Sequence, residues 1–331
     1  MKKKLILYAC LIGLLMTSCQ SRFLDLSSQQ AYIILNRPEN YQFGSPAWLS
    51  DEVIVFVGKP SNSDRKTPSL FLAYNILGQQ WKTILVPTNQ NCQISGFSFP
   101  EKLPNGHIGF VDTCITNGKE IRTIIEINIS TGKTQTLMDS GPIRVAGKFS
   151  FSPDMTELVQ EDMIGRFLSN KLFYRKNDDS IQIVPNFTRA MYPDWSPHDR
   201  KIAFWGTESY PGGEPNGFTT LPEILGLSSY SWDLFTATPD GTNIVKVLSS
   251  VDDALLIKWS PTERIIAFSG TIDGASGVFL ANPETSEVTR IWSTLGDFDW
   301  SPDGNKIVVL DTEEDKNGKL QNKNIYVIEI K

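Results

Sequence analysis

Hydrophobic and polar positions alternate in short segments that recur along the chain at intervals of about 40 to 50 residues. In three of them a Trp is followed at the seventh and ninth positions by large apolar residues, as Trp195 is by Ile202 and Phe204. The eighth position holds a smaller residue, such as Ala203. This alternation is typical of a pleated strand whose two faces meet different neighbours. The period indicates a repeat architecture.

Six aromatic anchors mark these repeats, three of them within Trp-Ser-Pro and three in degenerate copies: Trp48, Phe99, Phe151, Trp195, Trp259 and Trp300. We expect each anchor to end a first strand. The turn that follows is complete as Ser-Pro-Asp-Gly at Ser301 to Gly304. There Pro presets φ, Asp bonds its own backbone and Gly accepts a positive φ. We therefore interpret the repeated Trp, Ser, Pro and Asp residues as structural, not catalytic.

Two further apolar segments complete each repeat, as Leu70 to Tyr74 and Lys82 to Val86 do in the first. Four short antiparallel strands per repeat predict a propeller blade. The last repeat reaches only its third strand, Ile325 to Ile330, whereas Ala31 to Leu35 belongs to no repeat. We expect Ala31 to Leu35 to supply the outer strand of the last blade and to close the ring. The predicted fold is an all-β, six-bladed propeller over residues 31–331.

The repeat resembles that of TolB-like β-propellers, whose signature reads Trp-Ser-Pro-Asp-Gly and then Ile-Ala-Phe. Residues 194–206, 258–270 and 299–311 match it closely. The resemblance covers residues 31–331 and implies six four-stranded blades. TolB also carries a small α/β domain before its propeller, and none is visible here. The resemblance implies a stand-alone propeller, and a fold does not fix a function.

Residues 1–18 are predicted to be a lipoprotein signal peptide. Lys2, Lys3 and Lys4 form its charged start, and the apolar stretch that follows is too short to span a bilayer. The sequence that ends at Cys19 resembles a bacterial lipobox, which implies cleavage before Cys19 and diacylation of its thiol. An ordinary signal peptide with an incidental cysteine and a short N-terminal anchor are the alternatives. The resemblance implies a lipid-anchored protein of the bacterial cell envelope, in the outer membrane or facing the periplasm of a diderm.

Residues 19–30 are predicted to be a polar tether. The stretch from Gln20 to Gln30, fully extended, would reach about 35 Å and would keep the propeller near the membrane. Removal of the three signal-peptide lysines changes the formal net charge from −6 to −9. An acidic surface argues against nucleic-acid partners and against electrostatic adsorption to anionic lipid. The acyl chains would therefore have to hold the protein at the membrane.

Cys92 and Cys114 are the two cysteines that remain after Cys10 and Cys19 are assigned to the signal peptide and the lipid site. They flank the first hairpin of the second repeat, about equally far from its turn near Leu103. Antiparallel pairing would bring them opposite each other, and an exported environment permits a disulfide. Two separate thiols or a metal site are the alternatives.

Recognisable catalytic patterns are missing from the sequence. His107 and His198, the only histidines, stand at repeat turns, which makes a His-rich metal site improbable. No Gly-x-Ser-x-Gly elbow, phosphate-binding loop or dinucleotide fingerprint occurs. We predict no catalytic residue, no metal and no cofactor.

The segment from Thr207 to Tyr230 is predicted to be a long loop between the second and third strands of the fourth blade. Its candidate binding residues are Tyr210, Phe218, Leu221 and Tyr230. Loops of this length are usually functional or disordered. Decoration that covers a blade edge is the alternative to recognition.

Two functional hypotheses follow. The first is a non-enzymatic binding or scaffolding module for an envelope protein. The second is a small-ligand-binding protein or an enzyme, with a glycan or peptide held at the propeller pore. A deep, acid-lined pocket at the pore mouth with one strongly shifted carboxylate would favour the second hypothesis, and a flat aromatic rim would favour the first. The sequence predicts no particular oligomeric state.

Overall fold

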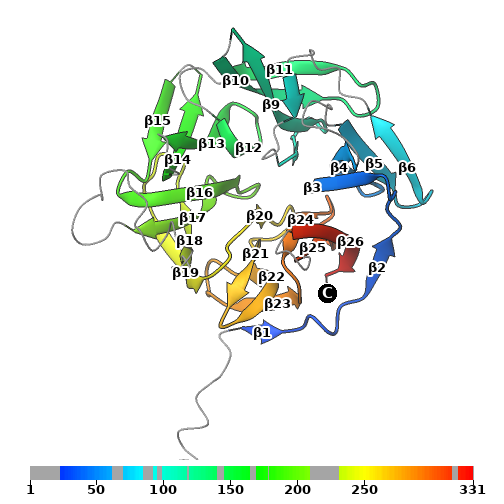
Figure 1. The fold of residues 1–331 in the computed structure, drawn as a ribbon. Coiled ribbons are helices and arrows are strands. Elements are labelled where there is room, and N and C mark those ends of the chain that lie inside the picture. Colours follow the sequence, from blue (N-terminus) through cyan, green and yellow to red (C-terminus); the bar gives the residue numbers. More distant parts are fainter. Residues whose placement is uncertain are drawn as a thin grey trace, which may run out of the picture.

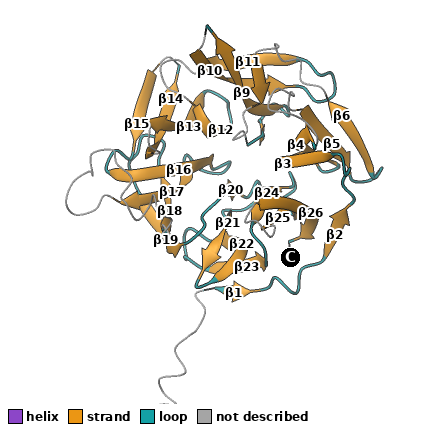
Figure 2. Cartoon of the chain, viewed as in Figure 1, coloured by secondary structure: helices purple, strands orange, loops and turns teal. Residues whose placement is uncertain are grey.

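The computed structural model describes residues 23–61, 70–84, 92–94, 99–117, 119–139, 145–164, 169–177, 179–208, 231–314 and 320–330. Its strands form six sheets, which stand as blades around a ring (Figure 1). Strands and the loops between them make up the drawn fold (Figure 2). Among the described residues, no helix is long and apolar enough to cross a membrane. The predicted six-bladed, all-β propeller is confirmed.

The first three blades follow one another along the chain, each with its first strand innermost. Blade one contains β3 (Tyr41–Ser50), β4 (Val53–Pro60), β5 (Leu70–Asn75) and β6 (Gln80–Ile84). Blade two contains β7 (Cys92–Ile94), β8 (Glu101–Lys102), β9 (Ile108–Thr116), β10 (Lys119–Ile127) and β11 (Thr134–Asp139). Blade three contains β12 (Val145–Phe151), β13 (Glu157–Ile164), β14 (Ser169–Lys176) and β15 (Asp179–Ile183).

The last three blades repeat this order. Blade four contains β16 (Phe187–Trp195), β17 (Ile202–Glu208), β18 (Trp232–Ala237) and β19 (Val245–Val251). Blade five contains β20 (Ile257–Trp259), β21 (Ile266–Ile272), β22 (Ala275–Ala281) and β23 (Val288–Trp292). Blade six contains β24 (Gly296–Trp300), β25 (Lys306–Glu314) and β26 (Leu320–Glu329) from the C-terminal part of the chain.

An N-terminal strand completes blade six, as predicted. β2 (Tyr32–Leu35) pairs antiparallel with β26, in a register that sets Leu35 opposite Ile325. The sheet order is β2-β26-β25-β24, so β2 is the outermost strand of the blade. An N-terminal strand and the last strand of the described chain therefore pair in one sheet, which closes the ring.

A second N-terminal strand was not predicted. β1 (Leu24–Asp25) pairs in parallel with β23, on the outside of blade five. Arg290 Nη1 lies 3.0 Å from Asp25 Oδ2, and the Phe23 ring packs edge-on against Phe279 at 5.2 Å between ring centroids. The segment expected to be a tether is therefore docked on the propeller from Phe23 onward.

The predicted anchor of blade two was wrong. Lys102, not Phe99, pairs with the first residue of the second strand, Ile108, as Trp300 pairs with Ile307 in blade six. Leu103 N donates to His107 O and Gly106 N donates to Leu103 O, which reproduces the bonds of Ser301 and Gly304. The turn Leu103-Pro104-Asn105-Gly106 thus takes the place of Ser-Pro-Asp-Gly, three residues later than expected.

The core consists of six clusters, each shared by two neighbouring blades. The two faces of β17 show the principle: Ile202 and Phe204 pack with blade three, whereas Ala203 and Trp205 pack with blade five. The anchors Trp48, Trp195, Trp259 and Trp300 each join the cluster shared with the preceding blade. The structural interpretation of the anchors and of the alternating strand is confirmed.

Candidate functional site

The innermost strands carry a set of equivalent positions, one residue before each anchor, at the centre of the ring. These positions hold Ala47, Glu101, Ser150, Asp194, Lys258 and Asp299. The anchor-pairing register is the same in every blade, so the six side chains occupy equivalent places around the pore. Five of the six residues are polar or charged.

Three of these side chains fasten one blade to another. Asp194 Oδ2 accepts a hydrogen bond from the backbone N–H of Trp259 at 2.7 Å, and Asp299 Oδ2 accepts one from Trp48 at 2.7 Å. Ser150 Oγ accepts the equivalent bond from Trp195 at 3.0 Å. Each bond joins the residue before one anchor to the anchor backbone of the next blade. Charged groups at the pore thus also hold the ring together.

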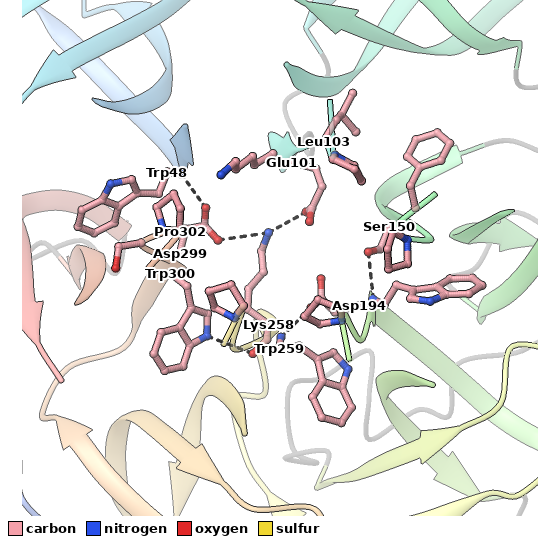
Figure 3. Close-up of a pocket in the computed structure, with 18 residues that line it drawn as sticks. Trp48, Glu101, Leu103, Ser150, Asp194, Lys258, Trp259, Asp299, Trp300 and Pro302 are labelled. Carbon is pink, nitrogen blue, oxygen red and sulfur yellow. Dashed lines mark hydrogen bonds and ion pairs between the residues drawn. The ribbon is translucent and has the colours of Figure 1, made fainter. Parts of the chain in front are cut away.

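Two lysines link these acids into an ion network. Lys258 Nζ lies between two carboxylates, 2.7 Å from Glu101 Oε2 and 3.4 Å from Asp299 Oδ1 (Figure 3). Lys148, two residues before Ser150 and with a completely buried side chain, also pairs with Glu101 Oε2. Its Nζ lies 3.5 Å from Asp194 Oδ1. The pore network therefore contains three carboxyl groups and two ammonium groups, from blades two to six.

Burial raises the pKa values of the acids in the network, whereas the neighbouring lysines lower them. Burial raises the pKa of Asp194 to about 6, although Lys148 opposes the shift. Burial also raises the pKa of Asp299, again against the pull of a lysine, Lys258. For Glu101 the burial effect is outweighed by Lys148 and Lys258, and its pKa is lowered. Glu101 is therefore the carboxylate that stays ionised between the lysines.

A cavity of about 340 Å³ opens at this end of the pore. Glu101, Asp194, Lys258 and Asp299 form its floor, and Figure 3 shows their side chains converging at its centre. Its rim comes from the turns after the anchors and carries one proline from each of five blades: Pro104, Pro153, Pro197, Pro261 and Pro302. The cavity thus combines an apolar rim with a charged floor, and its volume lies at the small end of the range for ligand pockets.

A second polar layer lies deeper in the ring. Ser45, Tyr192 and Asp297 stand two residues further from the turns on innermost strands, and Glu161 lies on β13. Ser45 Oγ donates to Asp297 Oδ2 at 2.6 Å, and Tyr192 N donates to Glu161 Oε2 at 3.2 Å. Tyr192 has a φ of 54°, in the left-handed region, at a bulge of β16. Burial raises the pKa of Glu161 to about 7, and the neighbouring Asp162 adds to the shift. A carboxyl group that titrates near neutrality therefore lies inside the ring.

The predicted Cys92–Cys114 disulfide is present, with the two residues directly opposite each other and an S–S distance of 2.03 Å. Among the described residues, Cys92, Asp112 and Cys114 are the one group of possible metal ligands gathered within 4.8 Å. Because both sulfurs are in the disulfide, this group does not offer a thiolate site. The bond ties β7 to β9, two strands whose register Cys92 helps to fix.

The other predicted site residues lie outside the described part of the chain. These are the lipid site Cys19 and the candidate loop residues Tyr210, Phe218, Leu221 and Tyr230. The two histidines lie in turns: His198 Nε2 is 3.1 Å from Ser260 O, and His107 Nδ1 is 3.2 Å from Glu126 Oε2. Neither is among the residues that line the cavity.

The pore residues were missed at the sequence level, although part of the signal was visible. Asp194, Lys258 and Asp299 each immediately precede a Trp-Ser-Pro anchor, so they occupy the same position of the repeat. Equivalent positions of a propeller repeat face the same axis, which would have indicated a shared site. Glu101 was not recognised as equivalent because Phe99, three residues before the true anchor position Lys102, was predicted to be the anchor of blade two. Lys148 joins the ion network from a position two residues before Ser150. The repeat pattern does not show how far its side chain reaches along the pore.

Neither a protein-family model nor a curated protein matches the sequence of this chain. Among solved structures, TolB from Acinetobacter baumannii superposes with a TM-score of 0.55 at 14% identity, over 85% of this chain and 64% of that one. An oligogalacturonate lyase in complex with manganese gives a TM-score of 0.52 at 12% identity, over 93% and 95% of the two chains. A gluconolactonase from Xanthomonas campestris gives 0.51 at 9% identity, over 91% and 90%.

These similarities concern the fold. The propellers that match include TolB and enzymes, and identities of 9 to 14% do not carry an activity from one chain to another. The chain also spans less than two thirds of the A. baumannii TolB. With six four-stranded blades closed by an N-terminal strand, the chain has the TolB-like six-bladed β-propeller fold.

Proposed function

We propose that the protein is a binding module of the bacterial cell envelope, anchored by lipid on Cys19, and that its site is the cavity at the pore mouth. Its ligand is a short exposed segment of an envelope protein, inserted between the rim prolines. The observation that carries this proposal is the cavity itself, with its apolar rim above a charged floor.

The rim supports an apolar contact with little loss of conformational freedom. Pro104, Pro153 and Pro197 are exposed at the mouth, and Pro261 and Pro302 are half-buried. Proline side chains lose almost no rotamer entropy when they are covered. A peptide can therefore be bound there with a smaller entropic cost than on a surface of long flexible side chains.

The floor favours a ligand that carries a positive charge. The network contains three carboxyl groups against two ammonium groups, and the pKa of Asp194 is raised to about 6 by burial. Lys102 also lines the cavity, so the wall is not uniformly acidic. A Lys or Arg side chain of the partner, or its free amino terminus, would supply the cation that the floor lacks.

The geometry argues for binding rather than for chemistry at this floor. Asp194 and Asp299 each accept an anchor N–H, and Glu101 is shared by two lysines. Acids that hold the ring together cannot exchange protons freely with a substrate without weakening it. The charged floor therefore serves recognition in this proposal.

A matched pair of rim variants tests the proposal. Pro197→Lys and Pro197→Glu remove the same exposed proline but place opposite charges at the mouth. Crosslinking in native envelopes, followed by quantitative mass spectrometry, should show the main partner reduced at least tenfold by Pro197→Lys and retained by Pro197→Glu. Thermal unfolding of both variants checks that the propeller is intact. Equal capture by the two variants would refute recognition of a cationic segment here.

Deletion of residues 208–229 tests the earlier hypothesis that the long loop of blade four is the recognition site. β17 ends and β18 begins at the face opposite the Ser-Pro turns, so the loop deletion and the rim variants probe different faces. Loss of the partner in the deletion alone would move the site from the cavity to the loop residues Tyr210, Phe218, Leu221 and Tyr230.

A small-ligand site or enzyme at the pore is the second candidate, and a specific observation favours it. The pKa of Asp194, which lines the cavity, is raised to about 6 by burial, a value that suits acid–base chemistry near neutrality. Thermal-shift screening of neutral and amino sugars and of dipeptides against the purified protein tests this candidate. A shift that Pro197→Lys abolishes would support a small ligand at the cavity, and no shift with any compound would remove the support.

A further inference from the structure

The outer edge of blades five and six exposes a run of large apolar side chains. Leu24 on β1 is 59% exposed, and Tyr32, Ile33 and Ile34 on β2 are 51%, 51% and 54% exposed. β1 and β2 are the outermost strands of their sheets. Three consecutive exposed apolar residues on an outer strand are unusual for a surface that faces only water. We call these four residues the β1–β2 edge.

Aromatic packing holds the edge together across the two blades. The Tyr32 ring lies 5.2 Å from Trp292 of blade five and 5.5 Å from Tyr326 of blade six, both in edge-on geometry. Trp292 and Tyr326 also pack against each other at 4.7 Å. Tyr32 is therefore held in place at the seam between blades five and six. Figure 1 shows β1 and β2 one after the other along the perimeter of the ring, with the loop that joins them between.

The N-terminal chain begins at this edge. Phe23 packs on Phe279, and Arg290 neutralises Asp25 directly beside Leu24. Three residues separate Cys19 from Phe23, and the four Cα–Cα steps between them span at most ~14 Å when fully extended. The stretch between Cys19 and the docked residue Phe23 is therefore much shorter than residues 19–30, which the sequence predicted to be the tether. A lipid on Cys19 would bring this edge, rather than any other part of the ring, to the bilayer surface.

We propose that the β1–β2 edge rests on the lipid bilayer that holds the acyl chains of Cys19, an inference that relies on the lipid anchor of the proposed function. The apolar side chains enter the interfacial region, where tyrosine is especially favoured. They provide a second membrane contact besides the acyl chains. With the perimeter on the membrane, the pore axis runs along the bilayer plane. Both mouths of the pore, including the cavity, then stay open to partners.

Site-specific fluorescence in vesicles tests this orientation. Ile34→Cys and Ile181→Cys place a single thiol on an exposed isoleucine of an outermost strand, in blade six and in the opposite blade three. The native Cys92 and Cys114 are oxidised, and Cys19 is blocked by lipid. Each lipidated variant is labelled with an environment-sensitive dye and placed in phosphatidylethanolamine–phosphatidylglycerol vesicles. Spin-labelled lipids should quench the dye at position 34 at least twofold more than at position 181, with a blue-shifted emission only at 34.

Three outcomes would overturn the proposal. The first is equal quenching at the two positions. The second is a blue shift at position 34 that persists in detergent together with a dimeric mass, which would assign the edge to a second copy of the chain. The third is an unmodified Cys19 in the mass spectrum of the same sample. That third result also removes the lipid anchor from the proposed function but leaves the cavity test with the Pro197 variants unaffected.

Discussion

Lys148 shows how a single residue can decide both the charge and the stability of the pore. Its side chain is completely buried, yet it carries the cation that faces Glu101 and Asp194. Burial of an ion is tolerated only when partners compensate it. The buried lysine and the acids around it are therefore mutually dependent, and removal of either side leaves charge without compensation.

Replacing Lys148 by Met should lower the free energy of unfolding by about 3–5 kcal/mol at pH 7, because Glu101 and Asp194 would keep their charges without the ammonium. The loss should be smaller at pH 5, where Asp194, with its pKa raised to about 6 by burial, is mostly protonated. Urea unfolding at the two pH values measures both effects. Lys133→Met, at an exposed position, is the control and should change little. A loss that does not depend on pH would contradict the electrostatic explanation.

Glu161 predicts a second pH effect, of known sign. Burial raises the pKa of this carboxyl from 4.5 to about 7, so the folded state binds the proton more tightly than the unfolded state does. The associated stability is present below pH 4.5 and is lost as the pH rises through 7. Relative to Glu161→Gln, the wild-type protein should lose about 2–3 kcal/mol between pH 5 and pH 8. Urea titrations at these pH values test this, with the exposed Glu263→Gln as the control.

At the scale of the elements, β7 depends on a covalent bond. It has three residues and pairs only with β9, whereas the first strands of blades three and four have seven and nine residues. The Cys92–Cys114 bond fixes the start of this pairing. The disulfide thus secures a three-residue innermost strand that pairs with β9 alone.

Replacing both cysteines by serine should cost about 3 kcal/mol, since the bond closes a loop with a sequence separation of 22 residues. The amides of β7 should exchange with solvent much faster than before, while those of β21 in blade five should keep their protection. Hydrogen exchange followed by mass spectrometry resolves the two. Uniformly faster exchange in both blades would mean that the disulfide stabilises the whole ring and not one strand.

Elements were predictable from the sequence wherever side-chain period and turn chemistry agreed. Ile202, Ala203 and Phe204 alternate in size because opposite faces of β17 meet blades three and five. Ile266 to Phe268 repeat this alternation in blade five. The anchor of blade two was predicted wrongly because this blade keeps the turn, Leu103-Pro104-Asn105-Gly106, but has no aromatic residue directly before it. β1 was not predicted because a strand of two residues is too short to show an alternation of apolar and polar side chains.

The site was less predictable for a different reason. Glu101, Lys148, Asp194, Lys258 and Asp299 come from five blades and meet only because the ring closes. Each is an ordinary polar residue of one strand when the sequence is read linearly. Repeat alignment can say that equivalent positions face the same axis, but the contacts across the axis depend on blade number and on the depth of each side chain.

At the scale of the whole molecule, the ring is closed by four residues of β2, so the two faces of this strand have different roles. Leu35 is 4% exposed and lies in the cluster shared by blades six and one, whereas its neighbour Ile34 is 54% exposed on the perimeter. Leu35→Ala should therefore lower the free energy of unfolding by about 2–4 kcal/mol, through lost burial and a cavity at the closing seam. Ile34→Ala, in the same strand and with the same backbone bonds, should cost less than about 0.5 kcal/mol. Urea unfolding of the soluble protein without its lipid measures both, and equal losses in the two variants would mean that β2 closes the ring through its backbone pairing alone.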